Sequence, residues 1–208
     1  MRRARDELER RGIVTKASAD EMIETYVAAR LFAEARAFHR AHRHDATVAP
    51  PAFDDLRTPT DAPTLLHVLR DGARLQRRAF LLRGMQIVVV GSPWCAYSRA
   101  ATDAIARDTA LASVMAGRTT WVIPQQIVRD VRSVARWNHE HPAAAMAMMY
   151  RNDEWPFVRS TATPSFHFFR DGRLVASFSG WAGDAAKESL VDGLRAAGLV
   201  RDAPGDRR

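Results

Sequence analysis

The residue with the clearest capacity for covalent chemistry is the chain's only cysteine, Cys95. It follows an apolar run at 87–90 and a Gly-Ser-Pro turn, and it precedes a segment with the pattern of a helix. A thiol at the start of a helix lies near unpaired backbone N–H groups and the positive end of the helix dipole, which both favour the thiolate. Because the thiolate is the nucleophile in disulfide exchange, we predict a reactive sulfur here in preference to an inert buried thiol.

Two short motifs carry a resemblance to a known family. The run Trp94-Cys95-Ala96-Tyr97-Ser98 resembles the Trp-Cys-x-x-Cys site of the thioredoxin-like superfamily, with serine in place of the second cysteine. Thr163-Pro164, which precedes an apolar strand and a turn, resembles the family's cis-proline segment. The resemblance spans roughly residues 84–199 and implies two catalytic residues, Cys95 and Ser98. The substrate-binding residues that it implies are Trp94, Ala96, Tyr97, Thr163 and Pro164.

The serine at position 98 determines which mechanism we expect. A second cysteine would attack the mixed disulfide and release the partner, which a serine cannot do. A serine hydroxyl can instead donate a hydrogen bond to the Cys95 thiolate and lower its pKa. The resemblance therefore implies a monothiol thiol-disulfide oxidoreductase or isomerase that forms mixed disulfides and depends on an external thiol for release. Family members often carry a buried acid before the motif to serve the second cysteine, and residues 87–93 contain no carboxylate.

Three alternatives stay open at this stage. The chain could be a redox-inactive thioredoxin-like module that holds a protein partner, or a dithiol enzyme whose second cysteine has been replaced by Ser98. Iron–sulfur binding with glutathione is the third, although Ala96 and Tyr97 depart from the Cys-Gly-Phe-Ser motif of monothiol glutaredoxins. The pH dependence of Cys95 reactivity separates the first alternative from the monothiol enzyme.

Partners and cofactors follow from the composition and from the motifs that are missing. We expect a protein disulfide or thiol, or glutathione as a co-substrate, and no other cofactor. The net charge of +7 comes with no nucleic-acid-binding motif, and no apolar run is long enough for a membrane span. His39, His42 and His44 lack metal-ligand spacing, so we expect no metal site.

The N-terminus lacks the apolar region of a signal peptide, which indicates a cytoplasmic protein, or a periplasmic one if a signal was removed. The oligomeric state is not predicted.

The surrounding sequence predicts the parts that position these residues. We expect an N-terminal helical extension over 1–46, with one long helix from a capping box at Ser18 to about Arg43. A linker over 47–83 would contain a short helix capped by Asp61, with 73–83 as another helix or an edge strand. The thioredoxin-like domain would cover 84–199, and 200–208 would be a disordered tail.

Within 84–199 the resemblance implies an α/β, three-layer thioredoxin-like fold with a central mixed sheet flanked by helices. The predicted strands are Met85–Val90, Thr119–Ile123 and a hairpin turning at Asp171-Gly172. The predicted helices are 96–115, 125–139, 142–150 and a last helix capped by Asp184 and ended by Gly198. The order strand, motif, helix, strand would form a parallel, right-handed unit.

Overall fold

The computed structural model describes residues 7, 10–11, 15–58, 60–158 and 162–200. The chain divides into two compact units, Met1–Phe53 and Asp54–Arg208, and each is described by itself. The predicted tail, apart from Val200, and the first residues of the extension lie outside the described residues.

Over the range 18–43, where the sequence predicts a single long helix, the first unit has two. Helix α2 (Lys16–Ala28) and helix α3 (Phe32–Ala41) are separated by Arg30, whose φ is 64°. A residue in this left-handed region cannot continue a right-handed helix, so the expectation of one helix is wrong. The capping box is formed by Thr15 and Ser18, one turn earlier than predicted.

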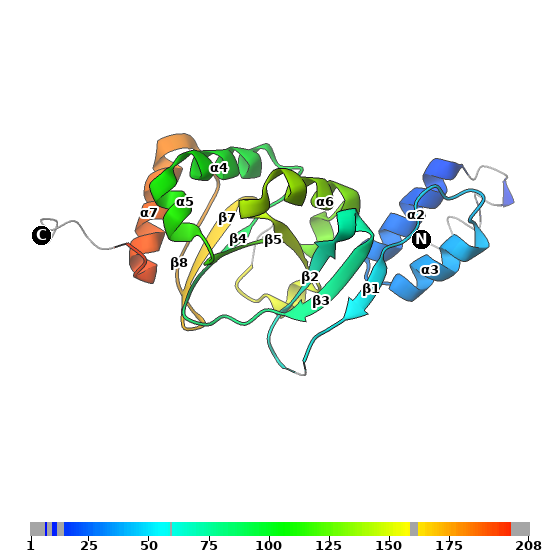
Figure 1. The fold of residues 1–208 in the computed structure, drawn as a ribbon, viewed down its shortest axis with the longest axis horizontal. Coiled ribbons are helices and arrows are strands. Elements are labelled where there is room, and N and C mark those ends of the chain that lie inside the picture. Colours follow the sequence, from blue (N-terminus) through cyan, green and yellow to red (C-terminus); the bar gives the residue numbers. More distant parts are fainter. Residues whose placement is uncertain (1–6, 8–9, 12–14, 59, 159–161, 201–208) are drawn as a thin grey trace, which may run out of the picture. The chain divides into compact units, whose positions relative to one another are not determined.

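The second unit is built on a mixed sheet (Figure 1). Among the described residues it has eight strands in the order β1-β3-β2-β6-β5-β4-β7-β8, and the boundary between the units falls inside β1. Strands β4, β5 and β6 are parallel neighbours, whereas β7 is antiparallel to β4 and to β8. The strands are β1 Ala52–Asp55, β2 Thr64–Leu69, β3 Arg74–Ala79, β4 Met85–Val90, β5 Thr119–Ile123, β6 Met146–Met149, β7 Ser165–Arg170 and β8 Arg173–Ser179.

Four helices accompany this sheet in the chain. They are α4 Ala96–Arg107, α5 Thr109–Met115, α6 Val131–Glu140 and α7 Gly183–Ala197. Figure 1 shows α4 and α6 on the same side of the sheet. The β4-α4-β5 unit, followed later by the β7-β8 hairpin and α7, gives the strand order β5-β4-β7-β8. The chain therefore has the predicted thioredoxin-like fold, an α/β fold with a mixed sheet flanked by helices and N-terminal helices before it.

Two segments predicted as helices are strands. Residues 65–69 lie in β2, which pairs with β3 and β6. For the segment 73–83, expected as a helix or an edge strand, the structure has the strand β3. Residues 142–150 form a 3₁₀ turn, Pro142–Ala144, followed by β6, whose four residues are all buried. A short apolar run fits a buried strand or a helix equally well by periodicity. Here β6 lies between β5 and β2, so the sheet hydrogen bonds of both neighbours decide its conformation.

Helix boundaries also differ from those predicted. The helix expected over 96–115 is broken at Asp108, which ends α4 and caps α5 by accepting a hydrogen bond from the Leu111 N–H. The helix expected from 125 begins at Val131, because Asp130 caps α6 there. Asp184 lies in the first turn of α7 but forms no capping hydrogen bond, whereas Gly198 ends the helix in the left-handed conformation as expected.

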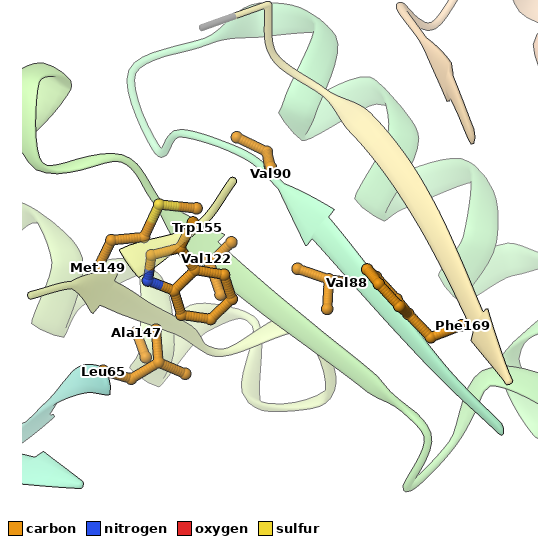
Figure 2. Close-up of a cluster of buried hydrophobic side chains, with 8 residues drawn as sticks. All are labelled: Leu65, Val88, Val90, Val122, Ala147, Met149, Trp155 and Phe169. Atoms are coloured by element: carbon orange, nitrogen blue, oxygen red, sulfur yellow. The ribbon is translucent and has the colours of Figure 1, made fainter. Parts of the chain in front are cut away.

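A buried apolar cluster covers one face of the sheet (Figure 2). Trp155 and Phe157 pack on this face, and the Trp155 ring is stacked on Phe80 with centroids 5.4 Å apart. A non-helical segment that follows the 3₁₀ turn Asn152–Glu154 therefore covers this face of the sheet. The cluster consists of Leu65, Val88, Val90, Val122, Ala147, Met149, Trp155 and Phe169.

A buried polar network fixes this covering segment to the sheet. The Glu154 carboxylate accepts hydrogen bonds from the Thr64 N–H at 2.7 Å and the Thr64 hydroxyl at 2.6 Å. It also pairs with the guanidinium of Arg77 on β3, at 3.0 Å. The Arg77 side chain is 6% exposed, and its guanidinium lies 3.5 Å from the centre of the Tyr150 ring. The network ties β2, β3 and the start of the segment that leads to Thr163.

Candidate functional site

Cys95 lies where a strand passes through a turn into a helix, as the sequence pattern predicts. Strand β4 ends at Val90, and the Gly91 N–H donates to the Val122 carbonyl at 2.9 Å. A Cβ atom at Gly91 would lie 2.9 Å from the Trp121 ring, so only glycine fits this approach to β5 without displacement. The Cys95 N–H then closes a turn onto the Ser92 carbonyl, and Cys95 is the N-cap residue of α4.

The sulfur faces a segment that is distant in sequence. The Cys95 thiol donates to the Thr163 carbonyl oxygen at 3.1 Å, and the Thr163–Pro164 peptide is cis, as the resemblance implies. Pro164 is buried, and its carbonyl accepts a hydrogen bond from the Gly180 N–H at 2.8 Å. Thr163 is half-buried, and its N–H has no hydrogen-bond partner among the described residues. The structure thus brings Cys95, Thr163 and Pro164 together.

Ser98 supports the turn that holds the cysteine. Its side chain is fully buried, and its Oγ accepts a hydrogen bond from the Ser92 N–H at 3.2 Å. A hydroxyl that accepts through a lone pair keeps its own proton for another acceptor. The Ser98 hydroxyl interacts with the Cys95 sulfur in a way that favours the thiolate. Ser98 therefore connects the backbone of the turn to the reactive atom.

The thiol is more acidic than an ordinary cysteine. Burial raises the pKa of Cys95. Hydrogen bonding with the Thr163 side chain, with the Ser98 backbone and hydroxyl, and with the Tyr97 backbone lowers that pKa by more than burial raises it. The net pKa lies below the usual value for a cysteine. Some of these groups lie in the first turn of α4. The lowered pKa therefore agrees with the stabilisation of a thiolate at a helix N-terminus that the sequence predicts. Cys95 is half-buried.

The remaining predicted substrate-binding residues adjoin Cys95 in the sequence and are at least partly exposed. Trp94 is half-buried, Ala96 is exposed, and the Tyr97 side chain is 63% exposed. Trp181, another aromatic residue of the motif pattern, is buried, with its ring 5.8 Å from that of Phe166. Trp181 therefore belongs to the core, whereas Tyr97 is free to meet a substrate.

Sequence reasoning missed one charged residue beside the site. The guanidinium carbon of Arg129 lies 5.9 Å from the centre of the Trp94 ring. Arg129 comes from the segment between β5 and α6, 34 positions after Cys95, and no spacing rule connects the two. Arg99, which the sequence does place near the motif, is exposed in the first turn of α4.

Two further observations concern metal ions and membranes. Among the described residues, no three His, Cys, Asp or Glu side chains are grouped so that they could hold a metal ion. In the same part of the chain, every helix is too short or too polar to span a membrane.

Comparison with known proteins gives matches only among solved structures. No family model matches the chain, and neither does any curated protein. The exposed lipoprotein thioredoxin of Streptococcus pneumoniae is 15% identical, with a TM-score of 0.44 over 64% of this chain and 98% of its own. StoA from Bacillus subtilis is 10% identical, with a TM-score of 0.42 over 64% and 99%. The N-terminal domain of PilB from Neisseria gonorrhoeae is 13% identical, with a TM-score of 0.39 over 52% and 76%. The fold assignment therefore depends on the strand order and connections of this chain itself.

Proposed function

We propose that this protein is a monothiol thiol-disulfide exchange protein that acts through Cys95. The observation that carries the proposal is the placement of the chain's only thiol at the N-terminus of α4, 3.1 Å from the carbonyl of Thr163 in the cis Thr163–Pro164 segment. The lowered pKa of the thiol adds to it, because a larger thiolate fraction at neutral pH gives a faster nucleophile.

The first step is attack by the Cys95 thiolate on one sulfur of a substrate disulfide. A bond forms between Cys95 Sγ and that sulfur, the substrate S–S bond breaks, and the other sulfur leaves as a thiolate. The Ser98 hydroxyl and the first-turn N–H groups of α4 stabilise the negative charge before attack. Nothing is oxidised or reduced overall in this step, because one disulfide replaces another.

The second step requires a thiol from outside the chain. No second cysteine exists to attack the mixed disulfide, so a protein thiol or glutathione would attack the Cys95 sulfur or the substrate sulfur. Attack at the substrate sulfur exchanges its partner, which amounts to isomerisation or transfer. Attack at Cys95 passes the disulfide on and leaves the substrate reduced.

Thr163 is suited to hold the substrate backbone during these steps. Its N–H has no partner among the described residues, and its carbonyl is engaged only by the thiol that reacts. Once Cys95 is a thiolate, that carbonyl can accept a hydrogen bond from an extended peptide, while the N–H donates to the same peptide. Trp94 and Tyr97 would contact the flanking side chains.

The test is the rate of Cys95 alkylation as a function of pH in the folded protein. We expect fast labelling with a midpoint below the free-cysteine value of about 8.5. The Cys95→Ser variant is the control for specificity, and mass spectrometry after incubation with oxidised glutathione detects the mixed disulfide. If labelling stays slow until the protein is unfolded, the proposal fails, and a redox-inactive binding module remains.

A Ser98→Cys variant tests the dithiol alternative. Positions 95 and 98 are one helical turn apart, within the Cα separation that a disulfide spans. If the chain derives from a dithiol enzyme, the variant should form this disulfide and gain dithiol reductase activity with a protein disulfide substrate. If the chain is a true monothiol protein, the variant should gain no dithiol reductase activity.

A further inference from the structure

Two arginine side chains near the Trp94–Ser98 motif have no acidic partner among the described residues. Arg129 is exposed and lies over Trp94, the residue directly before Cys95. Arg99 is exposed in the first turn of α4, four positions after Cys95. Among the described residues, no carboxylate lies within ion-pair distance of either guanidinium. Both charges therefore face solvent at the rim of the site.

The nearest acidic residues in sequence are engaged elsewhere or do not pair. Asp130 follows Arg129, but its carboxylate caps α6 by accepting hydrogen bonds from the Ser133 N–H at 2.6 Å and the Ser133 hydroxyl at 2.9 Å. Asp103 lies one turn after Arg99 on α4 and forms no ion pair with it in the described structure. The local charge beside Cys95 is therefore positive rather than balanced.

The contact with Trp94 gives Arg129 a defined position without neutralising it. A guanidinium over an aromatic face is held by the ring quadrupole, which leaves its charge available to another group. An anion that binds near Trp94 would meet this charge within about a Debye length, where screening is incomplete. Cationic groups beside a nucleophile raise the local concentration of anionic reactants.

We propose that Arg129, assisted by Arg99, makes Cys95 prefer disulfides that carry a carboxylate next to the reacting sulfur. The preference rests on the proposed function, because it concerns which disulfide the Cys95 thiolate attacks. The substrate class is thus a carboxylate-bearing disulfide. Two sources of it are a disulfide of a small thiol such as glutathione and a disulfide within an acidic peptide segment. Arg129 acts as a specificity residue and Cys95 as the nucleophile.

The experiment compares disulfide probes that differ in charge. The anionic probe is the bis-carboxylate aryl disulfide of Ellman's reagent, the neutral probe is 4,4′-dithiodipyridine, and the cationic probe is cystamine. Rates of Cys95 modification are measured at low and high salt for the wild type, Arg129→Gln and Arg129→Lys. Arg107→Gln is the matched control, because Arg107 is exposed at the opposite end of α4.

Because the aryl and alkyl probes differ in leaving group, the rate ratio is compared between salt conditions and between variants. We expect high salt to lower the wild-type ratio of anionic to cationic rates. Arg129→Gln should lower the anionic-to-cationic rate ratio about threefold to tenfold, the scale of a single exposed charge acting on opposite probe charges. Arg129→Lys should retain most of the ratio. The rate with the neutral probe should be the same in all of these variants.

An unchanged ratio in Arg129→Gln, or an equal fall in Arg107→Gln, would overturn the specificity proposal. A wild type that does not react with the neutral probe would instead overturn the proposed function, so the two failures are distinguishable. Oxidised glutathione and a peptide disulfide flanked by glutamates then separate the two sources. The source whose rate falls more in Arg129→Gln is the one that this side chain selects.

Discussion

Replacing Ser98 with alanine removes one oxygen that serves two groups. The Ser98 Oγ accepts the hydrogen bond from the Ser92 N–H at 3.2 Å, and it also interacts with the Cys95 sulfur. Ser98 is fully buried and Ser92 is 5% exposed, so water cannot take the place of the lost acceptor. The variant should therefore change both the stability of the domain and the acidity of the thiol.

The stability change follows from the unpaired Ser92 N–H. A buried donor left without its acceptor costs about 1–3 kcal/mol. For a unit of this size, that corresponds to a fall in the unfolding midpoint of roughly 2–12 °C. The pKa of Cys95 should rise, because a hydrogen bond that favours its thiolate is lost. The Thr163 and Tyr97 contributions would remain, so part of the acidity should survive.

Thermal unfolding and the pH profile of alkylation measure the two effects in one preparation. Ser189→Ala is the control, since Ser189 is a half-buried helix serine whose hydroxyl donates a solvent-exposed hydrogen bond to the Ala185 carbonyl. That variant should change stability by no more than about 0.5 kcal/mol. If Ser98→Ala is as stable as this control, the buried Ser92–Ser98 bond has no energetic role. If its alkylation midpoint stays constant or falls, Ser98 does not stabilise the thiolate.

Three further predictions concern the scaffold. Burial lowers the pKa of His167, so acidification below about pH 6.5 protonates the unfolded chain first and reduces stability by up to about 1.4 kcal/mol per pH unit. Denaturant titrations should show a shallower acid dependence in His167→Gln, and an identical slope would refute this origin. Glu154→Gln should cost about 1–3 kcal/mol, because the buried Arg77 guanidinium loses the closer of its two carboxylate partners and keeps only Asp55 at 3.5 Å; a neutral outcome in denaturant unfolding would count against the network. Gly193→Ala places a Cβ 2.2 Å from the Phe168 ring, so calorimetry should show about 1–3 kcal/mol of destabilisation that Phe168→Leu relieves. A rise in stability from helix propensity alone would contradict this packing.

The parts that the sequence predicts well are those set by local rules. An apolar run, a turn and a helix start define the backbone around Cys95, and the Asp171-Gly172 turn defines the hairpin that follows Pro164. Residues 146–149 could not be assigned in this way, because four apolar residues carry no period that separates strand from helix. Their conformation comes from β5 and β2 on either side, which are contacts between residues distant in sequence.

The same distinction applies inside the site. The acidity of Cys95 depends on groups within three residues of it and on Thr163, which lies in a recognisable motif. The reactivity of Cys95 can therefore be predicted from the sequence. Arg129 reaches Trp94 from the short non-helical stretch between the 3₁₀ turn Gln125–Ile127 and α6, which begins at Val131 rather than at 125. A helix begun at 125 would have placed Arg129 inside a helical turn. The nucleophile is thus encoded locally, whereas the charge that we propose to select its substrate depends on where a distant helix is capped.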